Sequence, residues 1–297
     1  MKRHIPILFG AAIILAVVLI LAYPFLFPSA KVNAPQGFDG DRAYEDVLTQ
    51  LAFGPRVPGS AAHAQTVDWI QAELEKAGWQ TSLQEVTYAG HPIRNVIGTR
   101  GAEGPSILLG AHFDSRQVAD QDPDVNSRTQ PVAGANDGAS GVAVLLELAR
   151  SLPIDLSKQI TLVFFDMEDQ GSLPGSDWIL GSSAYAESLQ TLPEKVVIVD
   201  MIGDADLNIH FERNSDADLM TEIWSVAAEL GYSEQFVSEY KHSIYDDHFP
   251  FIKRGIPSAD LIDFDYPYWH TTGDTADKVS AGSLRAVGDT LWHWLQR

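Results

Sequence analysis

The hydrophobic and polar positions of the chain predict helices first and strands afterwards. Residues 41–54 and 61–79 carry apolar side chains at helical spacing, and each stretch reaches a glycine, where helices often end. Two strand-like stretches come next, at residues 81–90 and 93–101. They are followed by three mostly apolar runs, which suit buried and largely parallel strands: residues 106–112, 160–166 and 195–203.

Helical patterns alternate with these runs and continue after them. They lie at residues 141–152, 176–189, 217–231 and 280–297, and a last strand is predicted at 257–264. This alternation predicts an α/β fold, a three-layer α/β/α sandwich around a central, mostly parallel (mixed) sheet. In such open sheets ligands bind at the carboxyl ends of the strands. We therefore expect the chemistry in the residues that directly follow each apolar run.

The beginning of the chain has a different pattern. From Ile5 to Phe27 no residue is charged, and this length is enough for a helix to cross a bilayer of roughly 30 Å. The tripeptide VNA imitates the exit of a signal peptide, but Pro35 directly after it disfavours cleavage. We therefore expect a transmembrane anchor, with a cleaved signal peptide as the alternative.

Lys2 and Arg3 precede this span, so the N-terminus is expected in the cytoplasm and the remaining chain on the extracytoplasmic side. Pro, Gly, Ser and Asn after the span are typical of a linker. The predicted organisation is a cytoplasmic stub with the membrane anchor at 1–27, a linker at 28–38 and one folded domain at 39–297.

Composition narrows the kinds of site that the domain can hold. With 297 residues, 45% of them hydrophobic, the chain can bury a large core. Its net charge of -20 and its lack of a basic stripe argue against a nucleic-acid partner. The chain has no cysteine, so disulfides and thiolate metal sites are excluded. Any metal must be held by His, Asp and Glu.

The first apolar run and the segment after it carry candidate ligands. His112 and Asp114 stand at the end of that run, in GAHFDS. From its position alone, His112 is as compatible with a packed core residue as with a metal ligand. Asp137 lies in the glycine-rich segment GANDGASG, where it can cap a helix or, with glycines on both sides, approach an ion closely.

The next two runs also end in carboxylates. Glu168 and Asp169 are adjacent in FFDMEDQG, and Asp200 ends the third run in VDMIGD. Adjacent carboxylates often form only a solvated turn, and Asp200 can be a cap. Beside a metal, however, one carboxylate can bind the ion while its neighbour moves protons.

The last third of the chain adds further candidates. Asp246, Asp247 and His248 precede an aromatic turn, and His270 stands in the irregular segment DYPYWHTTGD. Carboxylates and imidazoles thus converge from several predicted strand ends, which is the ligand set of a zinc site with an open position for water or substrate. The remaining histidines have no such company and are assigned to structure or surface: His4, His63, His91, His210, His242 and His293.

The motifs HFDS, NDGASG, MED, VDMIGD, DDH-x-PF and WHT, in this order, resemble the zinc-aminopeptidase superfamily of co-catalytic metallopeptidases. Within it they are most similar to the glutaminyl-peptide cyclotransferase branch, over about residues 40–297. The resemblance implies that Asp137, Asp169 and His270 bind zinc. In the two-metal peptidases of this superfamily, the positions of His112 and Asp200 bind a second zinc, so one ion is expected and two remain open.

The resemblance also implies roles for other residues. Glu168 would be the general acid/base, Asp200 and Asp247 would form the carboxylate network that holds it and the substrate amine, and Trp269 would pack on the substrate. The branch often has a second pocket tryptophan soon after its glutamate pair. Here that region reads QGSLPG, and the nearest tryptophan is Trp178. Asp169 also stands where most members have Glu.

Three functions remain open at this point, and the two enzymatic ones have peptide or protein N-termini as substrate. The resemblance favours a zinc-dependent cyclotransferase that converts N-terminal glutamine to pyroglutamate with release of ammonia, supported by Trp269 and the pair Asp246 and Asp247. The second is a zinc aminopeptidase that hydrolyses the first peptide bond. The third is an inactive, membrane-tethered binding ectodomain, although every ligand and base position holds a competent residue.

Overall fold

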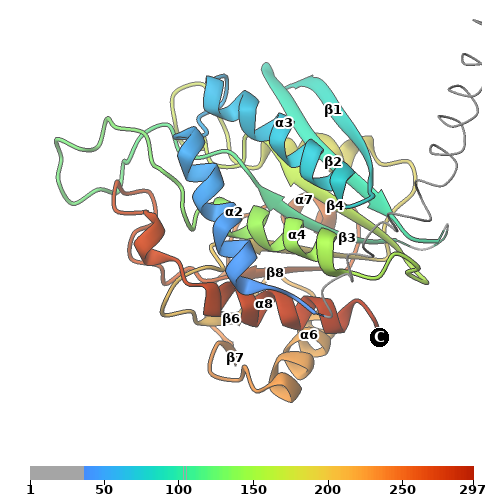
Figure 1. Ribbon diagram of the computed structural model, residues 1–297. Helices are drawn as coiled ribbons and strands as arrows, with labels where there is room; N and C mark the ends of the chain where they lie inside the picture. Colours follow the sequence, from blue (N-terminus) through green and yellow to red (C-terminus); the bar gives the residue numbers. More distant parts are fainter. Residues whose placement is uncertain (1–36, 103, 105) are drawn as a thin grey trace, which may run out of the picture. The chain divides into compact units, whose positions relative to one another are not determined.

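The computed structural model describes residues 37–102, 104 and 106–297 (Figure 1). The predicted membrane anchor and most of the predicted linker lie outside these residues. Among the described residues, no helix combines the length and the apolar character that crossing a membrane requires. The anchor therefore stays a prediction.

A six-stranded sheet forms the centre of the fold, in the order β1-β2-β4-β3-β5-β8. Strands β3, β4, β5 and β8 are mutually parallel, whereas β1 pairs antiparallel with β2, and β2 with β4. The mixed, mostly parallel sheet expected from the pattern is confirmed. Its strands are β1 (Gln80–Tyr88), β2 (His91–Arg100), β3 (Ser106–His112), β4 (Gln159–Phe165), β5 (Lys195–Asp200) and β8 (Ser258–Ile262).

The antiparallel edge follows from local turn chemistry. Ala89 and Gly90 join β1 to β2 with φ of 48° and 88°, the two positive values that a tight hairpin turn of the right twist requires. The parallel strands need long crossovers, which the helices supply.

Helices cover both faces of the sheet, which makes the three layers. Alternate residues of β3 separate the two cores: Leu109 packs with one set of helices, and Leu108 packs with Tyr185 and Phe251 on the other side. Figure 1 shows α2, α4 and α8 in front of the sheet. The first face carries α2 (Gly40–Phe53), α3 (Ala61–Lys76), α4 (Ala139–Ser151), α6 (Ala217–Leu230) and α8 (Ala281–Trp294), and the second carries α5 (Leu180–Ser188) and α7 (Phe249–Lys253).

Three short elements were not expected from the pattern: β6 (Ile209–Phe211), β7 (Phe236–Tyr240) and the 3₁₀ helix η1 (Ala276–Lys278). Strands β6 and β7 pair in parallel as a separate small sheet. A strand of three to five residues is too short to show a period, which explains why the sequence did not reveal this pair.

One predicted helix begins later than its pattern suggests. The apolar spacing predicts a helix from residue 176, but α5 begins at Leu180, after Ile179 with a left-handed φ of 54°. The N–H of Ile179 donates to the carbonyl of Glu168 at 3.1 Å, and that of Leu180 to the carbonyl of Met167 at 3.0 Å. These bonds tie the segment to the turn after β4 and leave Trp178 in a loop.

Candidate metal and catalytic site

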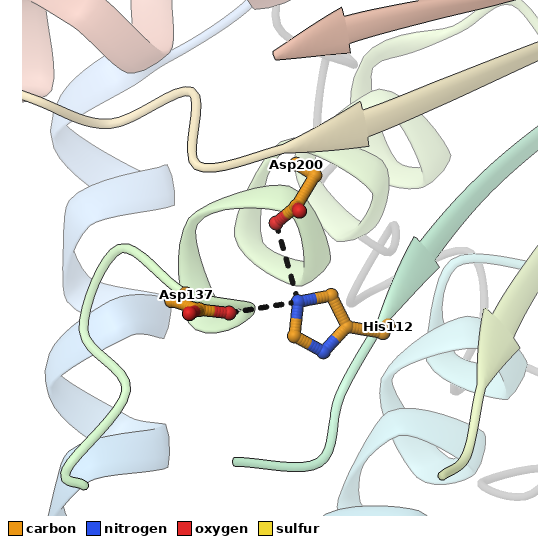
Figure 2. Close-up of side chains that lie close together, drawn as sticks. All are labelled: His112, Asp137 and Asp200. Carbon is orange, nitrogen blue, oxygen red and sulfur yellow. Dashed lines mark hydrogen bonds and ion pairs between the residues drawn. The ribbon is translucent and has the colours of Figure 1, made fainter. Parts of the chain in front are cut away.

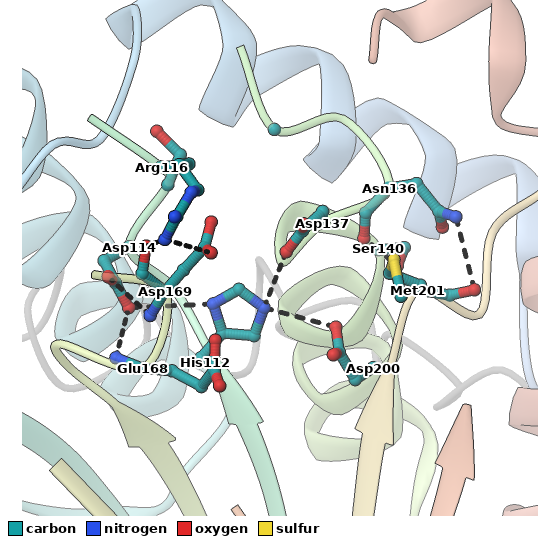
Figure 3. Close-up of polar contacts among 12 residues, drawn as sticks. His112, Asp114, Arg116, Asn136, Asp137, Ser140, Glu168, Asp169, Asp200 and Met201 are labelled. Atoms are coloured by element: carbon teal, nitrogen blue, oxygen red, sulfur yellow. Dashed lines mark hydrogen bonds and ion pairs between the residues drawn. The ribbon is translucent and has the colours of Figure 1, made fainter. Parts of the chain in front are cut away.

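The carboxyl ends of the central strands meet at one edge of the sheet, as the strand-end rule predicts. His112 is the last residue of β3 and Asp200 the last of β5, while Glu168 and Asp169 lie in the turn that follows β4. Figure 3 shows these four side chains grouped with Asp137, which lies just before α4.

The first group of ligand types contains Asp137, Asp169 and His270. Their ligand atoms lie within 4.8 Å of one another, and all three residues are buried. Nε2 of His270 is 2.8 Å from Oδ1 of Asp169 and 3.9 Å from Oδ2 of Asp137. Neither oxygen of Asp169 accepts a hydrogen bond from the described residues. Oδ2 of Asp137 likewise has no donor among the described residues, and unpartnered buried carboxylate oxygens beside an imidazole fit a divalent cation such as zinc.

The second group contains His112, Asp137 and Asp200 (Figure 2). Nε2 of His112 lies 3.1 Å from Oδ1 of Asp137 and 3.2 Å from Oδ1 of Asp200. Asp137 therefore offers Oδ1 to this group and Oδ2 to the first, so it can bridge two cations. The residues named for one and for two zinc ions are thus brought together, and the geometry allows either number.

The negative charge of this group is large for a buried site. Burial opposes the charged form of His112, yet the carboxylates of Asp200, Asp114 and Asp137 outweigh it and raise the pKa of the imidazole well above its usual range. Burial also raises the pKa of Asp200 to about 7. The raised pKa of His112 reflects the carboxylates around it, whose negative charge a bound cation would offset.

Two buried aspartates hold the ligand segments in place. Asp114 accepts hydrogen bonds from the backbone N–H groups of Glu168 (3.0 Å) and Asp169 (3.3 Å), as Figure 3 shows. Asp274 accepts from the N–H groups of Asn136 (2.9 Å) and Asp137 (3.2 Å). The sequence indicated Asp114 only as a strand-end residue and did not indicate Asp274. Hydrogen bonds between a side chain and a distant backbone N–H group leave no pattern in residue spacing.

Glu168 has the environment of a general base. It is 7% exposed and lines the cavity next to the two groups. Burial raises the pKa of Glu168 well above its usual range; His112 opposes the shift, and the carboxylates of Asp246 and Asp247 add to it. A carboxyl group whose pKa is raised in this way keeps its proton to higher pH than an ordinary glutamate, which suits a residue that exchanges protons with a substrate.

The cavity has a volume of ≈ 230 Å³, with a floor of carboxylates and a wall of apolar and aromatic side chains. Trp178 stacks on His270 with the ring centres 5.8 Å apart, and Trp269 stacks on the same imidazole at 3.7 Å. Phe264 and Tyr245 complete the aromatic part. The predicted position of Trp269 at the pocket agrees with this geometry. Trp178 was missed as a pocket residue because its sequence pattern suggested a helix.

Asp246 and Asp247 separate in the structure. Asp246 lines the cavity, whereas its neighbour Asp247 is fully buried and is absent from the cavity wall. Asp246 is thus the residue of the pair that a substrate would meet. The role of Asp247 in a carboxylate network stays a prediction, consistent with its charge acting on Glu168 through the protein interior.

The histidines assigned to structure or surface lie outside both groups, as far as the structure describes them. His63 is buried, and its Nε2 lies 2.7 Å from Oδ1 of Asp166. His4 lies outside the described residues. His248 forms a further buried group with Asp246 and Asp260, so it lies close to Asp246, whose carboxylate lines the cavity.

Comparisons with known proteins show the family of the chain. The profile of "Peptidase family M28" matches residues 95–295. A glutaminyl-peptide cyclotransferase-like protein of Bos taurus is 27% identical over 289 residues, covering 84% of this chain and 73% of its own.

Two solved structures show the same fold along most of the chain. The glutaminyl cyclase of Porphyromonas gingivalis is 36% identical with a TM-score of 0.82, covering 88% of this chain and 98% of its own. A Zn-dependent exopeptidase from Parabacteroides distasonis is 34% identical with a TM-score of 0.84, covering 89% and 99%. The family match over residues 95–295 and these structural matches show that the chain belongs to peptidase family M28, within the zinc-aminopeptidase superfamily.

Proposed function

We propose that the protein is a zinc-dependent glutaminyl-peptide cyclotransferase, which converts the N-terminal glutamine of peptides to pyroglutamate and releases ammonia. Asp137, Asp169 and His270 would hold the zinc ion. The proposal is supported by the relatives that carry this name and by the form of the cavity.

The observation that carries the proposal is the pair of indoles beside the ligand His270. Trp178 and Trp269 both stack on its ring, and they wall a small cavity above the acidic floor. In cyclisation the nucleophile belongs to the substrate, so the site gains by excluding water. A peptidase must instead admit water as its nucleophile. A small cavity whose ligand residues are covered by aromatic side chains therefore favours cyclisation.

The residues of the chain then have defined roles. The carboxylates of Asp200 and Asp246 line the cavity near Glu168 and would accept hydrogen bonds from the neutral α-amine of the substrate. Zinc, when bound, supplies Lewis-acid polarisation of the side-chain carbonyl of glutamine. Glu168 removes a proton from the α-amine as its nitrogen attacks the side-chain carbonyl carbon. It then gives that proton to the leaving nitrogen, so the C–N bond of the side-chain amide breaks and ammonia departs.

A second candidate is a zinc aminopeptidase, and one specific observation favours it. Asp137 is shared by the two groups of ligands, which suits a pair of metal ions. In that case Glu168 would take a proton from water, and the hydroxide would attack the first peptide bond. The named exopeptidase among the similar structures agrees with this candidate as well.

The location of the reaction is part of the proposal. The uncharged run from Ile5 to Phe27 would anchor the chain, with Lys2 and Arg3 on the cytoplasmic side and the catalytic domain outside. The substrates would then be secreted or surface-exposed peptides. Protease added to intact cells should digest the domain and leave a protected fragment; full protection of the domain would refute this orientation.

One experiment separates the functions. Purified full-length protein in detergent is incubated with a peptide that begins with glutamine, and the products are read by mass spectrometry. Loss of ammonia from an intact chain, abolished by a chelator, supports cyclisation, whereas loss of the whole first residue supports the aminopeptidase. Neither product, from protein without bound zinc, supports an inactive binding domain.

Two variants test the assigned residues within that experiment. Glu168→Gln removes the base but keeps the shape of the side chain, so turnover should fall by about 10²- to 10⁴-fold with zinc still bound. His270→Ala should lose the metal, measured by elemental analysis of the dialysed protein. Near-full activity of Glu168→Gln would refute the assignment of the general base.

A further inference from the structure

The segment from Arg116 to Asp122 follows β3 and belongs to none of the sequence motifs, yet it contacts the metal site on several sides. Arg116 is 1% exposed. Its guanidinium donates two hydrogen bonds to the carboxylate of Asp120, from Nε to Oδ1 at 2.8 Å and from Nη2 to Oδ2 at 2.9 Å. A paired guanidinium and carboxylate of this form is rigid, because two parallel bonds fix both planes.

Arg116 also holds the turn that carries Asp169. Its Nη1 donates to the backbone carbonyls of Asp169 and Gly171, each at 3.0 Å. Figure 3 shows the guanidinium beside the Asp169 side chain, whose Oδ1 is 3.8 Å from Nη1. The same guanidinium lies 4.9 Å from the ring centre of Trp178, within reach of a cation–π interaction. One side chain thus joins a ligand segment to the pocket wall.

Asp120 reaches the other side of the site, at His270. Its Oδ1 lies 3.3 Å from Nδ1 of the imidazole. This Nδ1 is buried, and among the described residues no group accepts a well-aligned hydrogen bond from it. The carboxylate of Asp120 is therefore placed to become that acceptor. Hydrogen bonds at catalytic sites are often long without ligand and tighten once it binds.

The backbone around His270 is held by the same segment. Gln121 donates its N–H to the carbonyl of His270 at 3.2 Å, and Asp122 accepts from the N–H of Thr272 at 2.9 Å. His270 has a φ of 55°, which costs energy for a residue with a Cβ and persists only where neighbouring contacts enforce it.

We propose that Arg116 and Asp120 are positioning residues for this metal site. Asp120 accepts a hydrogen bond from Nδ1–H of His270, so that Nε2 keeps its lone pair for the metal. Arg116 fixes the carboxylate of Asp120. Through its bonds to the Asp169 turn and its contact with Trp178, it also holds the segments of Asp169 and His270 and the indole of Trp178 at fixed positions relative to one another. The proposal rests on the proposed zinc site but not on the choice between cyclisation and hydrolysis.

The alternative is that the pair only stabilises the fold. In metal sites, partners of the ligand's second nitrogen are typically worth about 10- to 100-fold in metal affinity. A purely structural ion pair would change the stability of the metal-free protein and leave the zinc dissociation constant unchanged. Zinc affinity and the unfolding temperature of the metal-free protein therefore distinguish the two roles.

The test uses Asp120→Asn in the full-length chain, with zinc affinity measured by competition against a chromophoric chelator. Asn keeps the size of the side chain, but its amide N–H₂ group replaces one of the two carboxylate oxygens that accept hydrogen bonds from Arg116. We expect zinc binding to weaken by about 10- to 100-fold. The matched control is Asp124→Asn, because Asp124 is exposed in the same loop and its side chain bonds only to Asn126 among the described residues. This control should bind zinc like the unchanged protein.

The outcomes separate this inference from the proposed function. Equal zinc dissociation constants for Asp120→Asn and Asp124→Asn would overturn the positioning role, even if the protein is an active cyclotransferase. Weaker zinc binding in Asp120→Asn alone supports it, even if the reaction is hydrolysis. If Asp120→Asn lowers the unfolding temperature of the metal-free protein, Arg116→Lys provides the second measurement. Lys keeps the positive charge but lacks the planar guanidinium that makes two parallel hydrogen bonds to Asp120. Unaltered zinc affinity in this variant would also overturn the proposal.

Discussion

Gly171 should control the activity through Trp178, although it carries no side chain of its own. A Cβ built at Gly171 would lie 1.9 Å from Cδ2 of the indole, 2.0 Å from Cγ and 2.2 Å from Cε2. Gly171 is not among the residues with positive φ, so the perturbation in Gly171→Ala is the methyl group and not backbone strain. Carbon atoms without a bond prefer separations of about 3.5–4.0 Å, so the ring must move by roughly 1.5 Å or more.

The displaced ring loses two contacts. Its cation–π contact with Arg116 is worth about 0.5–1 kcal/mol, and its stacking on His270 about 0.5–1.5 kcal/mol. Trp178 is only partly buried, so it can swing outward without unfolding the domain. A displacement of about 1 Å in a positioning group can cost around 100-fold in rate, and we expect kcat/KM to fall by about 10- to 100-fold.

The assay measures kcat/KM for a peptide with N-terminal glutamine, or for the peptide that proves to be the substrate. The zinc content of the protein is measured alongside it. Zinc should stay bound, because no ligand moves. The control for a harmless methyl group is Gly282→Ala, where the nearest atom to the added Cβ is Oγ of Ser280 at 3.7 Å.

A double-mutant cycle gives the decisive result. If the methyl group acts by pushing Trp178, Gly171→Ala should have little further effect in a Trp178→Ala background. Unchanged kcat/KM for Gly171→Ala alone would refute the reasoning. A loss that persists in full after Trp178 is removed would refute it as well, because the methyl group would then act elsewhere.

Two further predictions concern stability and pH. Arg42→Ala removes the guanidinium that donates to both oxygens of the buried Glu147 at 2.6 Å. Arg42 is 38% exposed, and Glu147 keeps Nη1 of Arg150 at 3.5 Å, so the free energy of unfolding should fall by about 2 kcal/mol with kcat/KM unchanged. Denaturant titration checks this, with the exposed Arg297→Ala expected to cost under about 1 kcal/mol. Burial raises the pKa of Glu168 and Asp246 adds to it, so the base is protonated and activity is lost as pH falls through a pKa above that of an ordinary glutamate. Asp246→Asn should move this acidic limb of the kcat/KM profile to lower pH, and an unmoved limb would show that Asp246 does not act on Glu168.

The sequence by itself determined where the chemistry lies. Buried parallel strands appear as apolar runs, and the fold class requires that their carboxyl ends meet, so His112, Glu168, Asp169 and Asp200 could be grouped from their positions alone. The motif resemblance added His270, which stands in an irregular segment with no periodic signal. These inferences succeed because each depends on a local pattern and on one general rule of the architecture.

Only the tertiary structure decided which neighbouring side chains take part. Asp246 and Asp247 are adjacent, and the sequence does not tell which one meets the cavity. Trp178 has helical spacing, but hydrogen bonds to the carbonyls of Met167 and Glu168 delay the start of α5 and place it at the pocket. Arg116 and Asp120 lie in a loop without any motif. Their contacts join segments that are far apart in the chain, and such contacts depend on the packing of the whole domain, which neither spacing nor composition encodes locally.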